Sequence, residues 1–204
     1  MFGLMAAYAV SAPDIKAKIE EIGRRYGYFT ANRFRFYYEL LERLKEKPLK
    51  VVLEEVNDFW NGVRYASDMA VWGKKDFWAT PYSFLLKDRG DCEDYVIAKY
   101  FTLKRLGIDS SKLYFVYVKV KKSRVPHMVL AYYDTPESDP LILDNLNLKI
   151  FPASSRKDIV PVYTFNGELL ERFYDRSKNG LKSKSGRVKL KWDDLIKRME
   201  REPL

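Results

Sequence analysis

The sequence contains a single cysteine and a single histidine among its 204 residues. A disulfide needs two cysteines, and structural zinc sites use three or four Cys and His ligands. The composition therefore excludes both a disulfide framework and a Cys/His zinc centre. Any chemistry that depends on a thiol or an imidazole must use Cys92 or His127.

The sequence also lacks a long apolar run, internal repeats and low-complexity segments. The longest apolar stretch, Met1 to Val10, is far shorter than the roughly 20 residues needed to cross a bilayer. With 47% hydrophobic residues, the chain can bury the core of one domain. We therefore expect a chain that does not span a membrane and that forms one domain over residues 13–204.

The first twelve residues have two interpretations. Ala7-Tyr8-Ala9 has the form of a signal-peptidase site after an apolar run, but no basic segment precedes that run. Residues 1–12 are therefore either the remnant of a signal peptide or an apolar lead-in to the first helix.

The net charge of +9 is concentrated near the C-terminus. Residues 172–201 contain eleven basic and four acidic side chains, which leaves the rest of the chain nearly neutral. No nucleic-acid recognition motif accompanies this segment. We interpret it as a solvated edge and expect no nucleic-acid partner.

Helical patterns dominate the first half of the sequence. Apolar residues at helical spacing predict a helix that follows Pro13 and ends at Gly27, a second helix capped by Thr30 that runs to Glu46, and a third opened by Pro48. The pattern fails over residues 61–77, which predicts a long loop. Residues 80–86 then predict a short helix with Thr80 as its cap, and residues 92–106 a buried central helix that Gly107 ends.

The period changes to two in the second half. Residues 112–121, 126–133 and 141–146 predict three strands, and residues 187–192 predict an edge strand followed by a short helix from Asp193. The pattern predicts an α+β fold with N-terminal helices and a central helix packed on an antiparallel sheet. Its helical part covers about 13–107 and its sheet part about 108–204.

The residues that carry chemistry follow this order of elements. Cys92 begins the central helix, where the helix dipole favours a thiolate, while His127 and Asp144 lie on two successive strands. If those strands are neighbours, Asp144 can orient His127 as the ring accepts the thiol proton, as in papain-like catalysis. Each residue also has a structural interpretation: a small buried thiol, a core histidine and the polar end of a strand.

The segments around these three residues resemble a known family. GDCEDYVIAKYFTLKRLG, preceded by FWATPYSFL and followed by HMVLAYY and LILDNL, resembles the LapG-type bacterial transglutaminase-like cysteine proteinases. The likeness continues through VNDFW, VRYASD and PASSRKDIVPVYTFN and spans roughly residues 52–166. It implies a papain/transglutaminase-like core with Cys92, His127 and Asp144 as the catalytic triad.

The resemblance also implies a biological setting. Members of this family work in the periplasm, where they cut large repeat-rich surface adhesins near the N-terminus and release cells from a biofilm. An inner-membrane receptor for cyclic di-GMP holds them inactive, and they depend on calcium. Residues 1–12 show only the end of an export signal, so the sequence supports the periplasmic location less directly than the chemistry.

Three carboxylates surround the cysteine. Asp91, Glu93 and Asp94 should raise the pKa of the thiol and oppose the effect of the helix dipole. A bound calcium ion, which takes about 6 to 8 oxygen ligands, would remove that conflict. The alternative is that acidic residues in a first helical turn merely complement the dipole.

The leading hypothesis is therefore a calcium-dependent cysteine endopeptidase that acts through a thioester. A transglutaminase or amidase would form the same thioester on the same fold. A non-catalytic binding module would instead use the basic tail to hold an acidic partner. For the oxyanion, the backbone N–H of Cys92 is an expected donor, and the indole of Trp60 or Trp78 is a candidate for the second.

Overall fold

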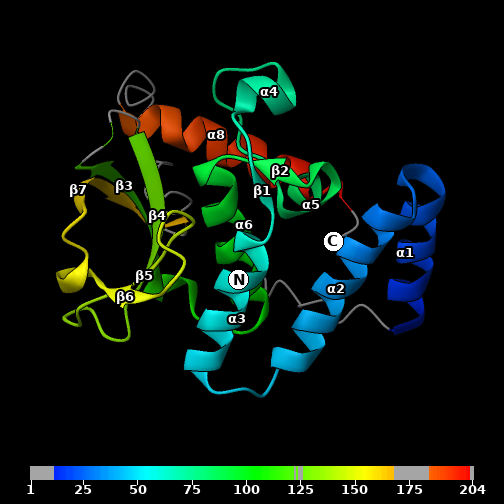
Figure 1. Ribbon diagram of the computed structural model, residues 1–204, viewed down its shortest axis with the longest axis horizontal. Helices are drawn as coiled ribbons and strands as arrows, with labels where there is room; N and C mark the ends of the chain where they lie inside the picture. Colours follow the sequence, from blue (N-terminus) through cyan, green and yellow to red (C-terminus); the bar gives the residue numbers. More distant parts are fainter. Residues whose placement is uncertain (1–11, 122, 124–125, 168–183, 203–204) are drawn as a thin grey trace, which may run out of the picture.

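The computed structural model of the chain describes residues 12–121, 123, 126–167 and 184–202. Residues 1–11, most of the segment 1–12 interpreted as a signal-peptide remnant or an apolar lead-in, and part of the basic segment therefore lie outside the described residues. The described chain places an antiparallel sheet on one side of helix α6, Cys92–Arg105, and the N-terminal helices on the other side (Figure 1). This arrangement confirms the predicted α+β class.

The first two N-terminal helices lie farthest from the sheet, whereas the third packs against α6 (Figure 1). These helices are α1 (Ala12–Tyr26), α2 (Tyr28–Leu44) and α3 (Leu49–Asn61), as the apolar spacing predicted. Gly27, with φ of 89°, allows the sharp turn between α1 and α2. Thr30 is not the cap of α2, because that helix already begins at Tyr28 and the Thr30 hydroxyl donates back to the Tyr26 carbonyl at 3.1 Å.

The segment between α3 and α6 is more ordered than the predicted loop. It contains β1 (Arg64–Tyr65), α4 (Asp68–Trp72), α5 (Pro81–Lys87) and β2 (Arg89–Gly90), and β1 and β2 pair in parallel. At the start of α5 the predicted cap is confirmed, because the Thr80 hydroxyl accepts the N–H of Ser83 at 3.0 Å. This cap fixes the chain direction just ahead of the cysteine.

Five strands form the main sheet, in the order β6-β5-β4-β3-β7 with antiparallel neighbours. Their bounds are β3 Leu113–Val120, β4 Pro126–Tyr132, β5 Leu141–Leu143, β6 Phe151–Pro152 and β7 Ile159–Phe165. The first three confirm the predicted strands, although β5 is shorter than expected. The sequence did not predict β6, which has only two residues, or β7, whose Pro161 argues against a strand except at an edge.

The central helix α6 is buried between the sheet and α3 (Figure 1). Phe115, Met128 and Leu130 belong to one face of the sheet and join the main core with α6, whereas Val118 and Val129 belong to a smaller cluster on the opposite face. The helix ends as predicted near Gly107, whose φ is 88°. The cysteine therefore stands at the start of the most enclosed helix of the domain.

The last described helix corrects the prediction for the C-terminal region. Residues 187–192 belong to α8 (Lys184–Met199), and Asp193 lies within this helix rather than at its start. The alternation in RVKLKW fits a strand, but Val188, Trp192 and Leu195 recur at helical spacing and are all buried. Burial of that stripe outweighs the short alternation.

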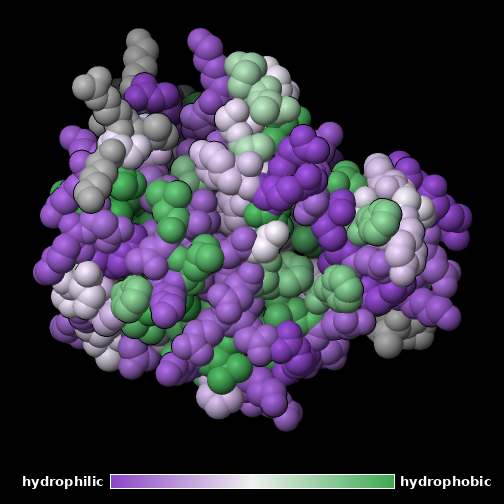
Figure 2. Space-filling model, in the orientation of Figure 1, coloured by the Kyte–Doolittle hydropathy of each residue, from purple (hydrophilic) through white to green (hydrophobic). Residues whose placement is uncertain are grey.

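The face of the molecule shown in Figure 2 is largely hydrophilic and is interrupted by smaller apolar patches. Scattered exposed apolar side chains of this kind are ordinary for a folded domain. None of the described helices combines the length and the apolar character that a membrane span requires.

Candidate active site

The turn that carries the cysteine is built around Gly90 and Asp94. The Asp94 carboxylate accepts the N–H groups of Ala79 and Asp91, at 2.7 and 3.2 Å. A Cβ atom at position 90 would overlap this carboxylate and the Phe84 ring, so only glycine fits there. The sequence Gly-Asp-Cys-Glu-Asp thus folds into a fixed entry to α6, with Cys92 as its first residue.

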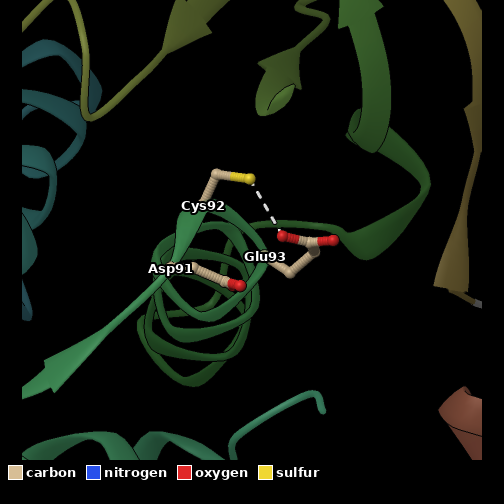
Figure 3. Close-up of side chains that lie close together, drawn as sticks. All are labelled: Asp91, Cys92 and Glu93. Carbon is tan, nitrogen blue, oxygen red and sulfur yellow. Dashed lines mark hydrogen bonds between the residues drawn. The ribbon is translucent and has the colours of Figure 1, made fainter. Parts of the chain in front are cut away.

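The Cys92 thiol faces a carboxylate. Its Sγ donates to Glu93 Oε2 at 2.9 Å, and the two side chains turn toward one another at the start of α6 (Figure 3). Burial raises the pKa of the thiol, the carboxylates of Glu93 and Asp91 raise it further, and the backbone of Met128 lowers it only in part. In this arrangement burial and the neighbouring carboxylates favour the protonated thiol.

His127 and Asp144 lie together, as expected if their strands are neighbours, although Asp144 directly follows β5 rather than lying on it. The strands β4 and β5 pair directly, and His127 Nε2 lies 2.7 Å from Asp144 Oδ1. Both side chains are buried. Since Nε2 is engaged by the carboxylate, Nδ1 is the nitrogen left to exchange a proton with a substrate or a thiol.

The cysteine lies beside the strand that bears the histidine. The backbone of Met128, one residue after His127, forms a hydrogen bond with the thiol that lowers its pKa in part. Within the described part of the chain, however, no hydrogen bond joins Cys92 to His127, and the thiol donates to Glu93. The structure therefore brings His127 and Asp144 together and holds Cys92 next to β4, with its thiol hydrogen-bonded to Glu93.

Arg156 is a site residue that sequence reasoning missed. It is 4% exposed, and its Nη2 donates to Asp144 Oδ2 at 2.6 Å while its Nε donates to Asp158 at 2.9 Å. Burial alone would raise the pKa of Asp144, but His127, the Leu146 N–H and Arg156 outweigh it and lower that pKa to about 2. In the sequence, Arg156 stands out only as part of the PASSRKD segment that resembles the family, and that segment indicates no chemical role for it.

A second missed group supports the loop after β5. Asn61 Nδ2 donates to the backbone carbonyl of Asp144 at 2.9 Å, and Lys99 Nζ donates to Asn61 Oδ1 at 2.8 Å. Lys99 is completely buried on α6, and burial lowers its pKa to about 7 despite the opposing carboxylates of Asp144 and Asp58. The helix that carries the cysteine is thus linked through Asn61 to the backbone of Asp144.

The acidic residues near the cysteine form two overlapping clusters. Asp68, Asp91 and Asp94 each offer an oxygen within 4.8 Å of the others, and Glu93 groups instead with Asp91 and Cys92. Asp68 was not predicted, because it reaches the cluster from α4, a separate element. Asp91 and Asp94 therefore share a cluster with Asp68, whereas Glu93 accepts a hydrogen bond from the thiol.

The charge of the first cluster is not balanced within the described residues. Burial, then Glu93 and Asp94, raise the pKa of Asp91 to about 9, and burial also raises the pKa values of Asp68 and Asp94. The Oδ1 atoms of Asp68 and Asp91 are buried without a described hydrogen-bond partner. A cation between such carboxylates would favour their ionised forms, and hard oxygen donors suit calcium.

The candidate indoles for the oxyanion differ in their surroundings. Trp60 Nε1 donates to the Thr102 hydroxyl at 3.0 Å inside the core, so this indole is not available as a donor. Trp78 Nε1 is buried without a described partner. The Cys92 backbone N–H and Trp78 remain the predicted donors.

The chain belongs to the family of bacterial transglutaminase-like cysteine proteinases, whose family model matches residues 39–158. It is therefore a cysteine protease, and its triad candidates all fall within the matched segment. No curated protein matches the chain.

Among solved structures, the chain is similar to LapG of Legionella pneumophila. The calcium-bound form is 41% identical with a TM-score of 0.72, over 90% of this chain and 98% of that chain. The EGTA-treated form is 39% identical with the same TM-score, over 90% of this chain and 96% of that chain. The likeness therefore extends beyond the catalytic segments to nearly the whole domain.

Proposed function

We propose that the protein is a calcium-dependent cysteine endopeptidase that cleaves a large, repeat-rich surface adhesin near its N-terminus and so controls release from a biofilm. The observation that carries the proposal is the position of Cys92 at the start of α6, a helix that packs on β4, the strand whose His127 is bound to Asp144. The likeness to LapG over 90% of this chain supports the same specialised role.

The chemistry follows from the groups in place. His127 Nδ1 accepts the proton of Cys92, and the thiolate attacks the peptide carbonyl. As the C–N bond breaks, the leaving amine takes the proton from His127, and a thioester remains on Cys92. Water then hydrolyses the thioester with His127 as the base, which restores the thiol. Asp144 keeps Nδ1 directed away from the carboxylate throughout.

The thiol must leave Glu93 before this cycle begins. Asp68, Asp91 and Asp94 would hold a calcium ion, since two of their oxygens are buried without a described partner. A bound calcium ion supplies positive charge that offsets the carboxylates now raising the pKa of the thiol. Glu93 stays a predicted ligand, and its release from Cys92 would free the thiol for His127.

The cellular setting completes the proposal. The enzyme acts in the periplasm, its substrate is the adhesin, and an inner-membrane receptor for cyclic di-GMP inhibits it. The family membership and the likeness to LapG support this setting.

A purified system tests the proposal. The N-terminal segment of the large adhesin of the same cell should be cut at one site by the protein with calcium, and not by the Cys92→Ala variant. The periplasmic part of the receptor should stop the cleavage. Incorporation of a fluorescent amine without cleavage would show a transglutaminase instead, and failure to modify any substrate would favour a non-catalytic binding module.

A further inference from the structure

Cys92 lines a cleft, and most of the other residues of this cleft take no part in the proposed chemistry. The cleft has a volume of about 1210 Å³ and reaches from Cys92 along the end of β3 to β7 and α8. Its walls carry a mixture of apolar and charged side chains, which is suited to a polypeptide segment rather than to a small apolar ligand.

Positive charge gathers on one side of this cleft. Lys119 and Lys121 lie at the end of β3, Arg187 lies on α8, and Lys75 faces them from the segment before α5. None of these four forms an ion pair with another described residue. A fifth cation, Lys191, is already paired with Asp76.

Among the described residues that line the cleft, the carboxylates without an ion pair lie at the cysteine end, whereas Asp76 is neutralised by Lys191. Asp91 and Glu93 line the cleft beside Cys92. A cleft with carboxylates at the nucleophile and unpaired cations farther along is polarised. Such a potential selects the orientation of a charged segment and excludes like charges.

The far wall is formed by a sheet edge. Within the described sheet, β7 pairs only with β3, and Val160 and Val162 on β7 are 44% and 52% exposed. An exposed strand edge can accept an extended peptide, while pockets between alternate side chains select its residues.

We propose that this cleft selects an extended peptide segment that carries aspartate or glutamate close to the scissile bond, on the side that lies along Lys119, Lys121 and Arg187. Apolar residues of the segment pack against Val160 and Val162. This inference rests on the proposed endopeptidase function, which it deepens by naming the substrate class.

A nucleic acid fits the same cleft less well. A polyanion would carry negative charge along its whole length and would meet Asp91 and Glu93 at the cysteine end. A peptide can place acidic residues at one end only. The charge pattern therefore favours the peptide.

The test uses a chymotryptic digest of a whole proteome as a peptide library. The calcium-loaded enzyme cuts the library, and mass spectrometry identifies the residues around each new terminus. We expect Asp and Glu to be enriched at least about threefold on one side of the cut, in keeping with the strength of exposed ion pairs. The enrichment should vanish in the double variant Lys119→Glu, Lys121→Glu and persist in the control Lys47→Glu, Lys50→Glu, whose lysines lie outside the cleft.

A second arm separates this inference from the proposed function. Immobilised Cys92→Ser protein is given the same library, and the retained peptides are identified. Enrichment of acidic peptides on this column supports the inference even if the enzyme cuts no peptide. The absence of cleavage would contradict only the endopeptidase proposal. Peptides with no acidic bias, or a bias unchanged in the Lys119→Glu, Lys121→Glu protein, would overturn the inference. Stronger retention of a single-stranded DNA oligonucleotide would overturn it in favour of a nucleic-acid site.

Discussion

The two halves of the active site differ in how their charges are balanced. On the sheet side, Asp144 receives hydrogen bonds from Leu146 and Arg156 and lies against His127, so both of its oxygens have partners. At the start of α6, by contrast, Asp68 and Asp91 each keep a buried oxygen without a described partner. The described ion pairs include neither of these two residues.

This difference separates what the chain provides from what a ligand must provide. The pair of His127 and Asp144 is preorganised by Arg156, a cation that belongs to the fold. The pKa of the Cys92 thiol is raised by nearby carboxylates, and the described ion pairs include neither Asp68 nor Asp91 of that acidic cluster. One half of the site is thus assembled by folding, and the other is where the proposed calcium ion would act.

The largest expected effect comes from removing the reacting groups themselves. Cys92→Ala and His127→Ala should each leave a folded protein and lower kcat/KM by about 10⁴-fold or more, while Asp144→Asn should retain a trace of activity. Cleavage of the adhesin segment, followed on gels, measures the activity of each variant, and circular dichroism verifies that each variant is folded. Full activity of Cys92→Ala would exclude a thioester mechanism.

Chelation tests whether the acidic cluster near Cys92 binds a cation. EGTA should lower both the melting temperature and the activity, because a ligand of the native state stabilises it by about 2.7 kcal/mol at a concentration 100 times its Kd. Calcium should restore both, and magnesium should do so poorly because it needs a tighter octahedral shell. Asp68→Asn and Asp91→Asn should mimic chelation, whereas Asp109→Asn, at an exposed turn, should not.

An unchanged melting temperature and full activity after exhaustive chelation would contradict the calcium site. The acidic residues would then serve only to complement the helix dipole. Calorimetric titration of the stripped protein with calcium, in wild type and in Asp68→Asn, gives the same answer without an activity assay.

The sheet side should respond to the loss of its internal cation. Arg156→Met should cost about 3–5 kcal/mol of unfolding free energy, because it leaves the Asp144 carboxylate buried without its charged partner. The depressed pKa of Asp144 adds stability above the unfolded value of 3.8, and this stability is lost as the pH falls toward about 2. Urea unfolding between pH 5 and pH 2 (about the range of that titration) should therefore show a smaller loss in Arg156→Met than in wild type. An equal loss in both proteins would show that Arg156 does not hold Asp144 ionised.

Lys99 provides a pH test of the link between α6 and the loop after β5. Its pKa is lowered from 10.5 to about 7, so between these values the unfolded chain binds more protons than the folded protein. The contribution of Lys99 to the free energy of unfolding therefore rises with pH from about 7 to 10.5. Wild type should gain stability relative to Lys99→Met as the pH rises from 7 to 9 (roughly the lower part of that window). Parallel pH profiles of the two proteins would contradict a buried, titrating lysine.

The sequence predicted the periodic elements and the order of the reacting groups. α1, α3 and α6 carry apolar residues at helical spacing, β3 alternates in part, and β4 and β5 are short apolar runs, so local patterns were sufficient for them. Cys92, His127 and Asp144 are singled out by scarcity and by the elements that carry them. Their chemistry could be argued before their positions were known.

The supporting residues could not be predicted because tertiary packing alone places them. Asp68 approaches Asp91 from a short helix, and Arg156 reaches Asp144 from a turn between two edge strands. Neither has a spacing that indicates a role. The failure at α8 has a related cause, since a short alternation over residues 187–192 competes with a helical stripe whose burial depends on contacts elsewhere in the chain.

The smallest expected effect isolates Glu93, where the two halves of the site meet. Glu93→Gln removes one charge and the ionised acceptor of the thiol proton without altering the sheet side. In EGTA, the thiol should react with iodoacetamide up to about tenfold faster near neutral pH, because a fall of one unit in its pKa raises the thiolate fraction by that factor. Glu46→Gln, at an exposed turn, is the matched control and should react as wild type does. Stability should change by less than about 0.5 kcal/mol, as for other partly exposed positions. If Glu93→Gln reacts no faster than wild type, Glu93 does not restrain the thiol, and burial of Cys92 alone accounts for its raised pKa.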